Sequence, residues 1–115
     1  MSQSSKKIAA AKFASDELCP AIEAIKLLGD ATTLLIIKDL ESGEKRYNEL
    51  LSKLAGVSTS TLSKRLKVLE ANGLITRKVI DSTPVKIIYS LSDKGIDSCK
   101  VVDSLRSFGK KHLLK

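Results

Sequence analysis

Short hydroxyl and basic side chains recur on one side of the segment that runs from Ser58 to about Asn72. At 100° per residue its leucines fall together, and the opposite side is short, polar and cationic. The candidate contact residues on the polar side are Ser60, Ser63, Lys64 and Lys67, and Thr59 at the start of the segment is a further candidate. Hydroxyl groups can donate to or accept from base edges, and lysine reaches guanine acceptors or phosphates. The pattern is suited to reading a DNA groove, although a solvated helix face shows the same residue types.

A second set of basic residues is placed to meet a nucleic-acid backbone. Segments 74–80 and 85–91 are rich in β-branched residues and bracket residues 81–84, which have the composition of a turn. We expect a β-hairpin there, packed on a helical core because two strands this short are marginally stable alone. The basic residues on or before this hairpin are Arg46, Arg77, Lys78 and Lys86. Between Lys45 and Lys94 there are ten basic and four acidic residues, so the positive charge is concentrated here.

Three helices are expected before the segment that could read a groove. The first opens at Pro20, a residue suited to the first helical position, and ends at Gly29. The second is capped by Asp30 and ends at Gly43. The third is short and covers about residues 47–54. The apolar stripe of the second helix consists of Thr33, Leu34, Ile37 and Leu40.

The order of these elements defines an expected fold. Gly56 supplies a turn between the third and fourth helices, and the hairpin follows the fourth. We therefore predict a mainly α fold with a small β-hairpin, a winged helix-turn-helix, in which one helix enters a major groove and the hairpin lies beside it on the phosphates. Two alternatives remain open. One is a winged helix used only for protein contacts, and the other is an architectural protein that coats DNA without sequence preference.

A last helix is expected from Asp93, capped by Ser92, to about Leu114. Its apolar stripe contains Cys99 together with the predicted dimer-interface residues Ile96, Val102, Leu105 and Phe108. So long a stripe has little core left to cover in a small domain, which favours a second subunit over a helix folded back on its own domain. We predict a leader over 1–15 that includes a candidate helical dimer arm, a DNA-binding domain over 16–92, and a dimerisation helix over 93–115.

Composition limits the other classes of function. The chain has 115 residues, a net charge of +7 and a pI near 9.5, which favours an anionic partner. No apolar run is long enough to span a membrane and no signal peptide is recognisable, so we expect a cytoplasmic protein without a membrane partner. With one histidine, His112, and two cysteines, we expect no metal site and no cofactor. Acidic residues are scattered and no glycine-rich phosphate loop exists, so an enzyme is not expected.

Several segments together resemble a known family. The residues are Cys19-Pro20, Leu34-Leu35-Ile36-Ile37, Arg46-Tyr47-Asn48-Glu49-Leu50, Gly56-Val57-Ser58, Leu62, Leu66, Leu69, Asn72-Gly73-Leu74-Ile75, Tyr89-Ser90-Leu91 and Gly95. In order and spacing, from about Cys19 to Phe108, they resemble HxlR-type winged-helix transcriptional regulators, which are related to the MarR regulators. The resemblance implies a homodimer formed by the terminal helices, bound to double-stranded DNA at an inverted-repeat operator. Ala31-Thr32 stands where the family usually has lysine and tryptophan, and the hairpin tip has fewer prolines.

Cys19 carries a further hypothesis. The resemblance implies that a cysteine before this proline is a family feature and that some members are thiol-based sensors. Physically, a thiol at a helix N-terminus lies beside unpaired amide groups that favour its thiolate. Cys99, on the predicted dimer helix, is a candidate resolving partner across subunits. The alternative is that Cys19 is a buried small hydrophobe. The sequence identifies no effector ligand.

Overall fold

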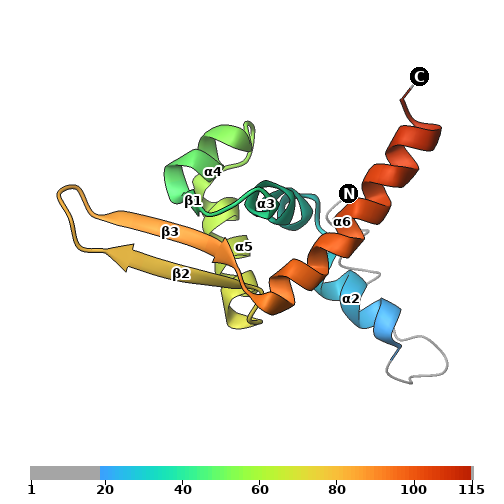
Figure 1. Ribbon diagram of the computed structural model, residues 1–115, viewed down its shortest axis with the longest axis horizontal. Helices are drawn as coiled ribbons and strands as arrows, with labels where there is room; N and C mark the ends of the chain where they lie inside the picture. The colour runs from blue at the N-terminus through green and yellow to red at the C-terminus, as the bar shows by residue number, and fades with distance from the viewer. Residues whose placement is uncertain (1–18, 115) are drawn as a thin grey trace. The chain divides into compact units, whose positions relative to one another are not determined.

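The computed structural model describes residues 19–114. Its contacts divide the chain into two units, Met1–Asp30 and Ala31–Lys115. The first unit contains one described helix, α2 (Pro20–Leu28). The second contains helices α3 (Ala31–Glu41), α4 (Tyr47–Lys53), α5 (Thr59–Ala71) and α6 (Asp93–His112), and strands β1 (Lys45–Arg46), β2 (Ile75–Ile80) and β3 (Lys86–Leu91). The predicted class, mainly helical with a small antiparallel sheet, is confirmed (Figure 1).

Helix α2 begins and ends where the sequence predicts. Cys19 is its N-cap in an extended conformation, and its backbone carbonyl accepts a hydrogen bond from the Glu23 amide at 3.0 Å. Pro20 takes the first helical position, where the lack of an N–H costs no hydrogen bond. At the other end the Gly29 amide donates to the Ile25 carbonyl at 2.7 Å. The predicted leader, 1–15, and its candidate helical arm lie outside the described residues.

The core of the second unit is made mainly of aliphatic side chains from its helices and its sheet. Fully buried side chains come from α3, α4 and α5, and they are Ile36, Ile37, Leu50, Leu62, Leu66 and Leu69. One detail of the predicted α3 stripe was wrong: Ile36 is fully buried, whereas Leu34 is only half-buried. The reason is that α3 packs against α5, α6 and β3 together, so its buried face is wider than a single stripe.

The predicted hairpin is confirmed as part of a three-stranded antiparallel sheet in the order β1-β3-β2. In the register, Arg77 pairs with Tyr89 and Lys78 pairs with Ile88, and the Thr76 and Ser90 hydroxyl oxygens lie 2.8 Å apart. The third strand, β1, was not predicted, because two residues are too few to show a periodic pattern. In Figure 1 the far end of the hairpin extends beyond the helices of this unit.

The end of α5 is fastened to the start of α6. Gly73 has φ of +77°, which suits glycine, and the turn it makes lets the Leu74 amide donate to the Leu69 carbonyl at 2.9 Å. The Ser92 hydroxyl donates to the Gly73 carbonyl at 2.5 Å and accepts from the Gly95 amide at 3.1 Å. A Cβ on Gly95 would overlap the Leu74 carbonyl oxygen. The last helix is therefore held closely against the turn that ends α5.

Candidate nucleic-acid interface

Helix α5 presents Ser60, Lys64 and Lys67 on the side opposite its buried leucines, and Thr59 and Ser63 lie nearer the leucine face. Thr59, Ser60, Lys64 and Lys67 are exposed, whereas Ser63 is half-buried at the flank of the leucine face. These five residues therefore lie on one helix, four of them exposed and Ser63 partly accessible. Arg65, which the sequence placed beside the apolar stripe, is half-buried. Two lysines and two hydroxyl groups on the exposed side are a chemistry that suits both base edges and phosphates.

The N-terminus of α5 is ordered by hydroxyl groups. Ser58 is the N-cap, as predicted, and its side-chain oxygen accepts a hydrogen bond from the Thr61 amide at 3.1 Å. The same hydroxyl donates to Thr61 Oγ1 at 2.9 Å and lies 3.1 Å from Ser60 Oγ. The positive end of the helix dipole also lies at this N-terminus, near the start of this surface.

Tyr47 was not identified as a site residue from the sequence. It begins α4, is half-buried, and its hydroxyl lies 3.1 Å from Ser63 Oγ and 3.4 Å from the Thr59 carbonyl oxygen on α5. A tyrosine that recurs with leucines at helical spacing is expected in the core. Only its hydroxyl group, which needs a hydrogen-bond partner when buried, could have indicated this polar role from the sequence. Tyr47 thus joins the two helices of the helix-turn-helix through polar contacts.

The sheet register divides the four basic residues that were predicted to contact DNA phosphates between the two faces of the sheet. Paired residues in neighbouring strands point to the same face, so Arg46 and Lys78, which both pair with Ile88, lie on one face. Lys86 precedes Ile88 by two residues on β3 and therefore shares that face. Arg77 pairs with the buried Tyr89 and belongs to the opposite face. The structure therefore brings three of the four basic residues together and leaves Arg77 apart from them.

The predicted dimer residues of α6 also divide. The side chains of Val102 and Cys99 are already buried within a single chain, with 6% and 7% of their surface exposed. Ile96, Leu105 and Phe108 are 57%, 52% and 58% exposed. Nine residues at 100° each place Ile96 about half a turn from Leu105, so the two cannot face one partner surface together. Leu105 and Phe108 are therefore exposed enough to make the predicted dimer contact, whereas Val102 has little exposed surface for it.

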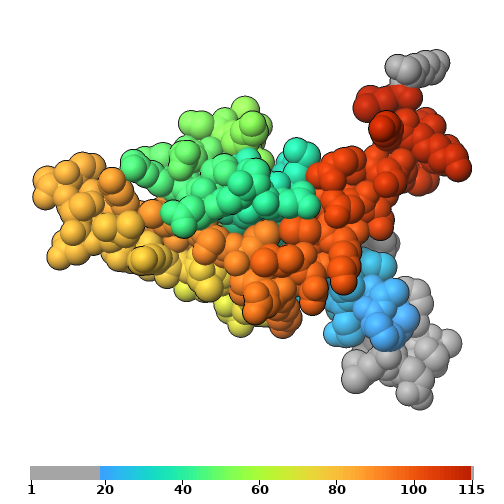
Figure 2. Space-filling model, viewed as in Figure 1, coloured from blue at the N-terminus to red at the C-terminus, as the bar shows by residue number. Residues whose placement is uncertain are grey.

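A continuous exposed apolar stripe runs along the C-terminal half of α6. It follows helical spacing and consists of Val101, Leu105 and Phe108, and the His112 ring lies tilted against Phe108 one turn further on. The rings of Phe108 and His112 have centroids 4.9 Å apart. In Figure 2 the C-terminal turns of this helix stand clear of the sheet and of the other helices of their unit. We refer to Val101, Leu105 and Phe108 below as the α6 stripe.

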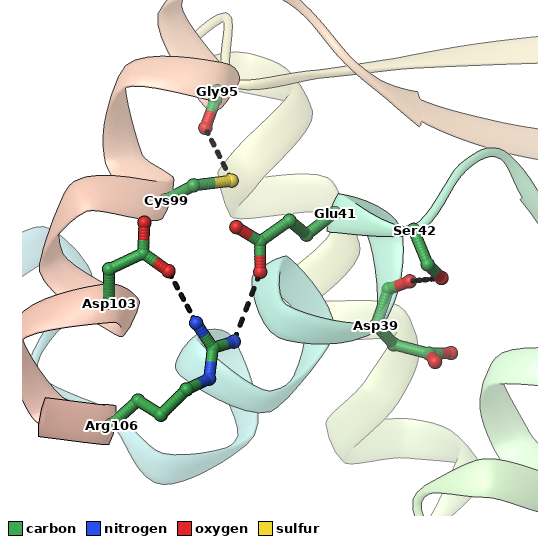
Figure 3. A network of polar contacts seen from close by, with 7 residues as sticks. All are labelled: Asp39, Glu41, Ser42, Gly95, Cys99, Asp103 and Arg106. Atoms are coloured by element: carbon green, nitrogen blue, oxygen red, sulfur yellow. Dashed lines mark hydrogen bonds and ion pairs between the residues drawn. The ribbon is translucent and has the colours of Figure 1, made fainter.

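The environments of the two cysteines differ. Cys19 is half-exposed in the first unit, and Cys99 is buried in the second, with its thiol 3.8 Å from the Gly95 carbonyl oxygen (Figure 3). Burial raises the pKa of the Cys99 thiol, and the negative charges of Glu41 and Asp103 raise it further, against a smaller opposing effect of Arg106. Reactive thiolate is therefore disfavoured at Cys99. Neither cysteine forms a disulfide within the described residues.

Arg106 connects α6 to α3 beside Cys99. Its guanidinium donates to Asp103 at 2.5 Å and to Glu41 at 3.2 Å (Figure 3). These hydrogen bonds raise the pKa of Arg106, Asp103 contributing more than Glu41. All three side chains remain partly open to solvent, so the contacts orient the helices more than they stabilise the fold.

Other kinds of site find no support in the described part of the chain. Across residues 19–114, no cluster of three or more histidine, cysteine or acidic residues could hold a metal ion. Of the helices with described positions, none is both long and apolar enough to cross a bilayer.

The helix-turn-helix, the capped polar helix and the basic hairpin together define a winged helix-turn-helix DNA-binding protein. Residues 27–115 match the HxlR-like helix-turn-helix family. The chain belongs to that family, which confirms the resemblance drawn from the sequence.

Relatives and solved structures agree with this assignment. The HTH-type transcriptional regulators YvaP and YodB of Bacillus subtilis (strain 168) are 44% and 43% identical to this chain; the aligned regions cover 69% and 68% of it and 74% and 70% of the relatives. A structure from Porphyromonas gingivalis W83, assigned to the MarR family of transcriptional regulators, has a TM-score of 0.82 at 33% identity and covers 88% of this chain and 99% of its own. The redox regulator HypR in its oxidised form has a TM-score of 0.78 at 25% identity, covering 84% and 100%.

The protein is thus a transcriptional regulator with a DNA-binding helix-turn-helix and a MarR-like fold. The family and its relatives are regulators and not enzymes, which confirms the expectation that the chain is not an enzyme.

Proposed function

We propose that the protein is a sequence-specific regulator that binds an inverted-repeat operator as a homodimer. In this proposal α5 enters the major groove, where Thr59, Ser60, Ser63, Lys64 and Lys67 meet base edges. The basic face of the sheet, made of Arg46, Lys78 and Lys86, meets the flanking phosphates. The observation that carries the proposal is the exposed polar side of α5, opposite three fully buried leucines and fixed at its N-terminus by Ser58.

The homodimer is supported by the α6 stripe. Half-exposed leucine and phenylalanine side chains at helical spacing are costly to leave in water, and a second copy of the helix would cover them. A two-fold dimer presents two copies of α5, which matches a site with two inverted half-sites. Monomers coating DNA without preference would need neither the stripe nor a particular half-site spacing.

The experiment that tests sequence-specific binding compares two DNA duplexes and two variants. An operator is first selected from fragmented genomic DNA, and a scrambled duplex of equal length is the control. We expect Lys64→Ala to weaken operator binding by about fivefold to a hundredfold and to blur preference at one or two positions, with little change on scrambled DNA. Lys86→Ala should weaken both duplexes alike. Equal losses on both duplexes from Lys64→Ala would contradict a reading role for α5.

We also propose that Cys19 responds to oxidants. Support comes from its half-exposed position at the N-cap of α2 and from the likeness to HypR, a redox regulator, and to YodB, whose structure has also been solved after diamide treatment. Two thiols would lose two protons and two electrons to form one disulfide, and diamide would accept both as it is reduced to the hydrazine. The buried Cys99, with its raised pKa, is not suited to react first.

The thiol proposal is tested by mass spectrometry and DNA binding after diamide treatment. Oxidised wild-type protein should gain a disulfide that includes Cys19 and should change its operator affinity. Cys19→Ser should abolish both changes, and Cys99→Ser distinguishes whether Cys99 is the resolving partner. Unmodified Cys19 and an unchanged affinity in the oxidised wild type would overturn the redox role without affecting the DNA-binding proposal.

A further inference from the structure

The hydroxyl of Tyr47 is held between two groups of α5. It lies 3.1 Å from Ser63 Oγ and 3.4 Å from the Thr59 carbonyl oxygen, and the tyrosine side chain is half-buried. Ser63 is also half-buried, in contrast to the exposed Ser60 and Lys64. The Ser63 side chain is therefore confined by a neighbour from α4, while the other candidate contact residues of α5 are not confined in this way.

The two contacts of Tyr47 share a single phenolic proton. A carbonyl oxygen can only accept, so the contact with Thr59 uses the single phenolic proton of Tyr47. The contact between the two hydroxyl groups allows either of them to donate. When the phenolic proton is directed at the Thr59 carbonyl, Ser63 donates to Tyr47 and Ser63 Oγ keeps only acceptor capacity.

We infer that Tyr47 is a positioning residue that sets the hydrogen-bond polarity of Ser63, so that this serine selects an amino group in the major groove. A free serine hydroxyl donates or accepts and discriminates weakly between bases. An acceptor alone matches the N6 amino group of adenine or the N4 amino group of cytosine. Guanine O6 and N7 and thymine O4 are acceptors, and they would be left without a partner. The inference rests on the proposed entry of α5 into the groove and adds the class of base that one residue reads.

The test measures base preference at every position of the selected operator. Binding is compared for wild type, Tyr47→Phe, Ser63→Ala and Tyr89→Phe, with thermal unfolding recorded for each. Tyr47→Phe keeps the ring and removes only the hydroxyl. Tyr89→Phe removes the hydroxyl of the buried tyrosine on β3 and is the matched control for loss of a phenol.

Wild type should prefer adenine or cytosine at one position where Ser63→Ala removes the preference. At that same position Tyr47→Phe should reduce discrimination against guanine and thymine by roughly threefold to tenfold, the value of one net hydrogen bond. Discrimination at the other positions, and all positions in Tyr89→Phe, should remain as in wild type. A loss of stability alone would weaken binding to all duplexes alike and leave the preference intact.

Three results would overturn the inference while the proposed function stands. They are a guanine or thymine preference at the position lost in Ser63→Ala, no position altered by Ser63→Ala, or an unchanged profile in Tyr47→Phe. If Tyr47→Phe is unfolded at the assay temperature, the base preferred at the Ser63 position decides alone. Failure of the proposed function itself is a different result, because wild-type protein would then enrich no operator.

Discussion

Helix α5 and the C-terminal half of α6 both carry exposed surfaces, but of opposite chemistry. The exposed side of α5 carries hydroxyl and ammonium groups, and its leucines are fully buried. On α6 the exposed side carries Val101, Leu105 and Phe108, while Cys99 and Val102 face inward. Polar and cationic groups fit a charged polymer, whereas an apolar stripe fits another apolar surface. The difference assigns the two helices to two kinds of partner.

The largest effect is expected from a charge placed on the α6 stripe. Leu105→Glu puts a carboxylate in the proposed dimer contact, so we expect monomers by sedimentation and a loss of operator affinity on the order of a hundredfold. The matched control is Ile96→Glu, which changes an equally exposed side chain on the other side of the helix. If Leu105→Glu stays dimeric, or if both variants dissociate alike, the assignment of the α6 stripe to a partner copy is wrong.

The joint between the two helices provides the next prediction. Gly95→Ala should lower the free energy of unfolding by about 1–3 kcal/mol, because the new methyl group overlaps the Leu74 carbonyl. The control is Gly109→Ala, further along α6, where a Cβ meets no atom of the described chain within 4 Å. That change should add about 0.5–1 kcal/mol, since alanine favours a helix more than glycine does. Chemical denaturation measures both, and equal effects would show that α6 is not held closely at its start.

A smaller effect should distinguish the two faces of the hairpin. Lys78 shares its face with Arg46 and Lys86, whereas its neighbour Arg77 lies on the face of the buried Tyr89. We expect Lys78→Ala to reduce the slope of log affinity against log salt concentration by about 0.9, as for one lost phosphate contact, and Arg77→Ala to change it less. Titrations at several salt concentrations give both slopes. The reverse order would place the other face of the hairpin on DNA.

The smallest effect concerns the pH dependence contributed by Cys99. Its pKa is raised from the ordinary value of 9.0, so the unfolded chain loses this proton at lower pH than the folded chain. The folded state therefore keeps the associated stability below pH 9 and loses it as pH rises towards the raised pKa. We expect the stability of wild type to fall more steeply between pH 8 and 10 than that of Cys99→Ala. Parallel pH profiles would contradict the raised pKa.

Local signals predicted the elements well. Pro20, Gly29, Ser58 and Ser92 mark helix ends in the sequence because their capping chemistry is local, and the structure has helices beginning or ending at each of them. Alternation of residue types predicted the hairpin for the same reason. Four of the candidate contact residues of α5, Ser60, Ser63, Lys64 and Lys67, also followed from helical spacing alone, and their contact with DNA stays a prediction.

Features that depend on long-range contacts were not predictable. The strand β1 exists only because β3 lies beside it, and the face on which Arg77 lies depends on the register with Tyr89. The polar role of Tyr47 needs α4 and α5 to be placed against each other. The apolar residues of α6 formed one stripe in the sequence, but in the structure some are buried and others are exposed. The reason is that α3 covers only part of the helix.

The central claim is that two copies of this chain read one symmetric operator. Hydroxyl-radical footprinting of the wild-type protein on the selected operator, with competitor DNA present, tests it most directly. We predict two protected patches related by two-fold symmetry, with centres about one helical turn or a multiple of it apart. Uniform protection along the duplex, or a single patch without a symmetric counterpart, would contradict the claim.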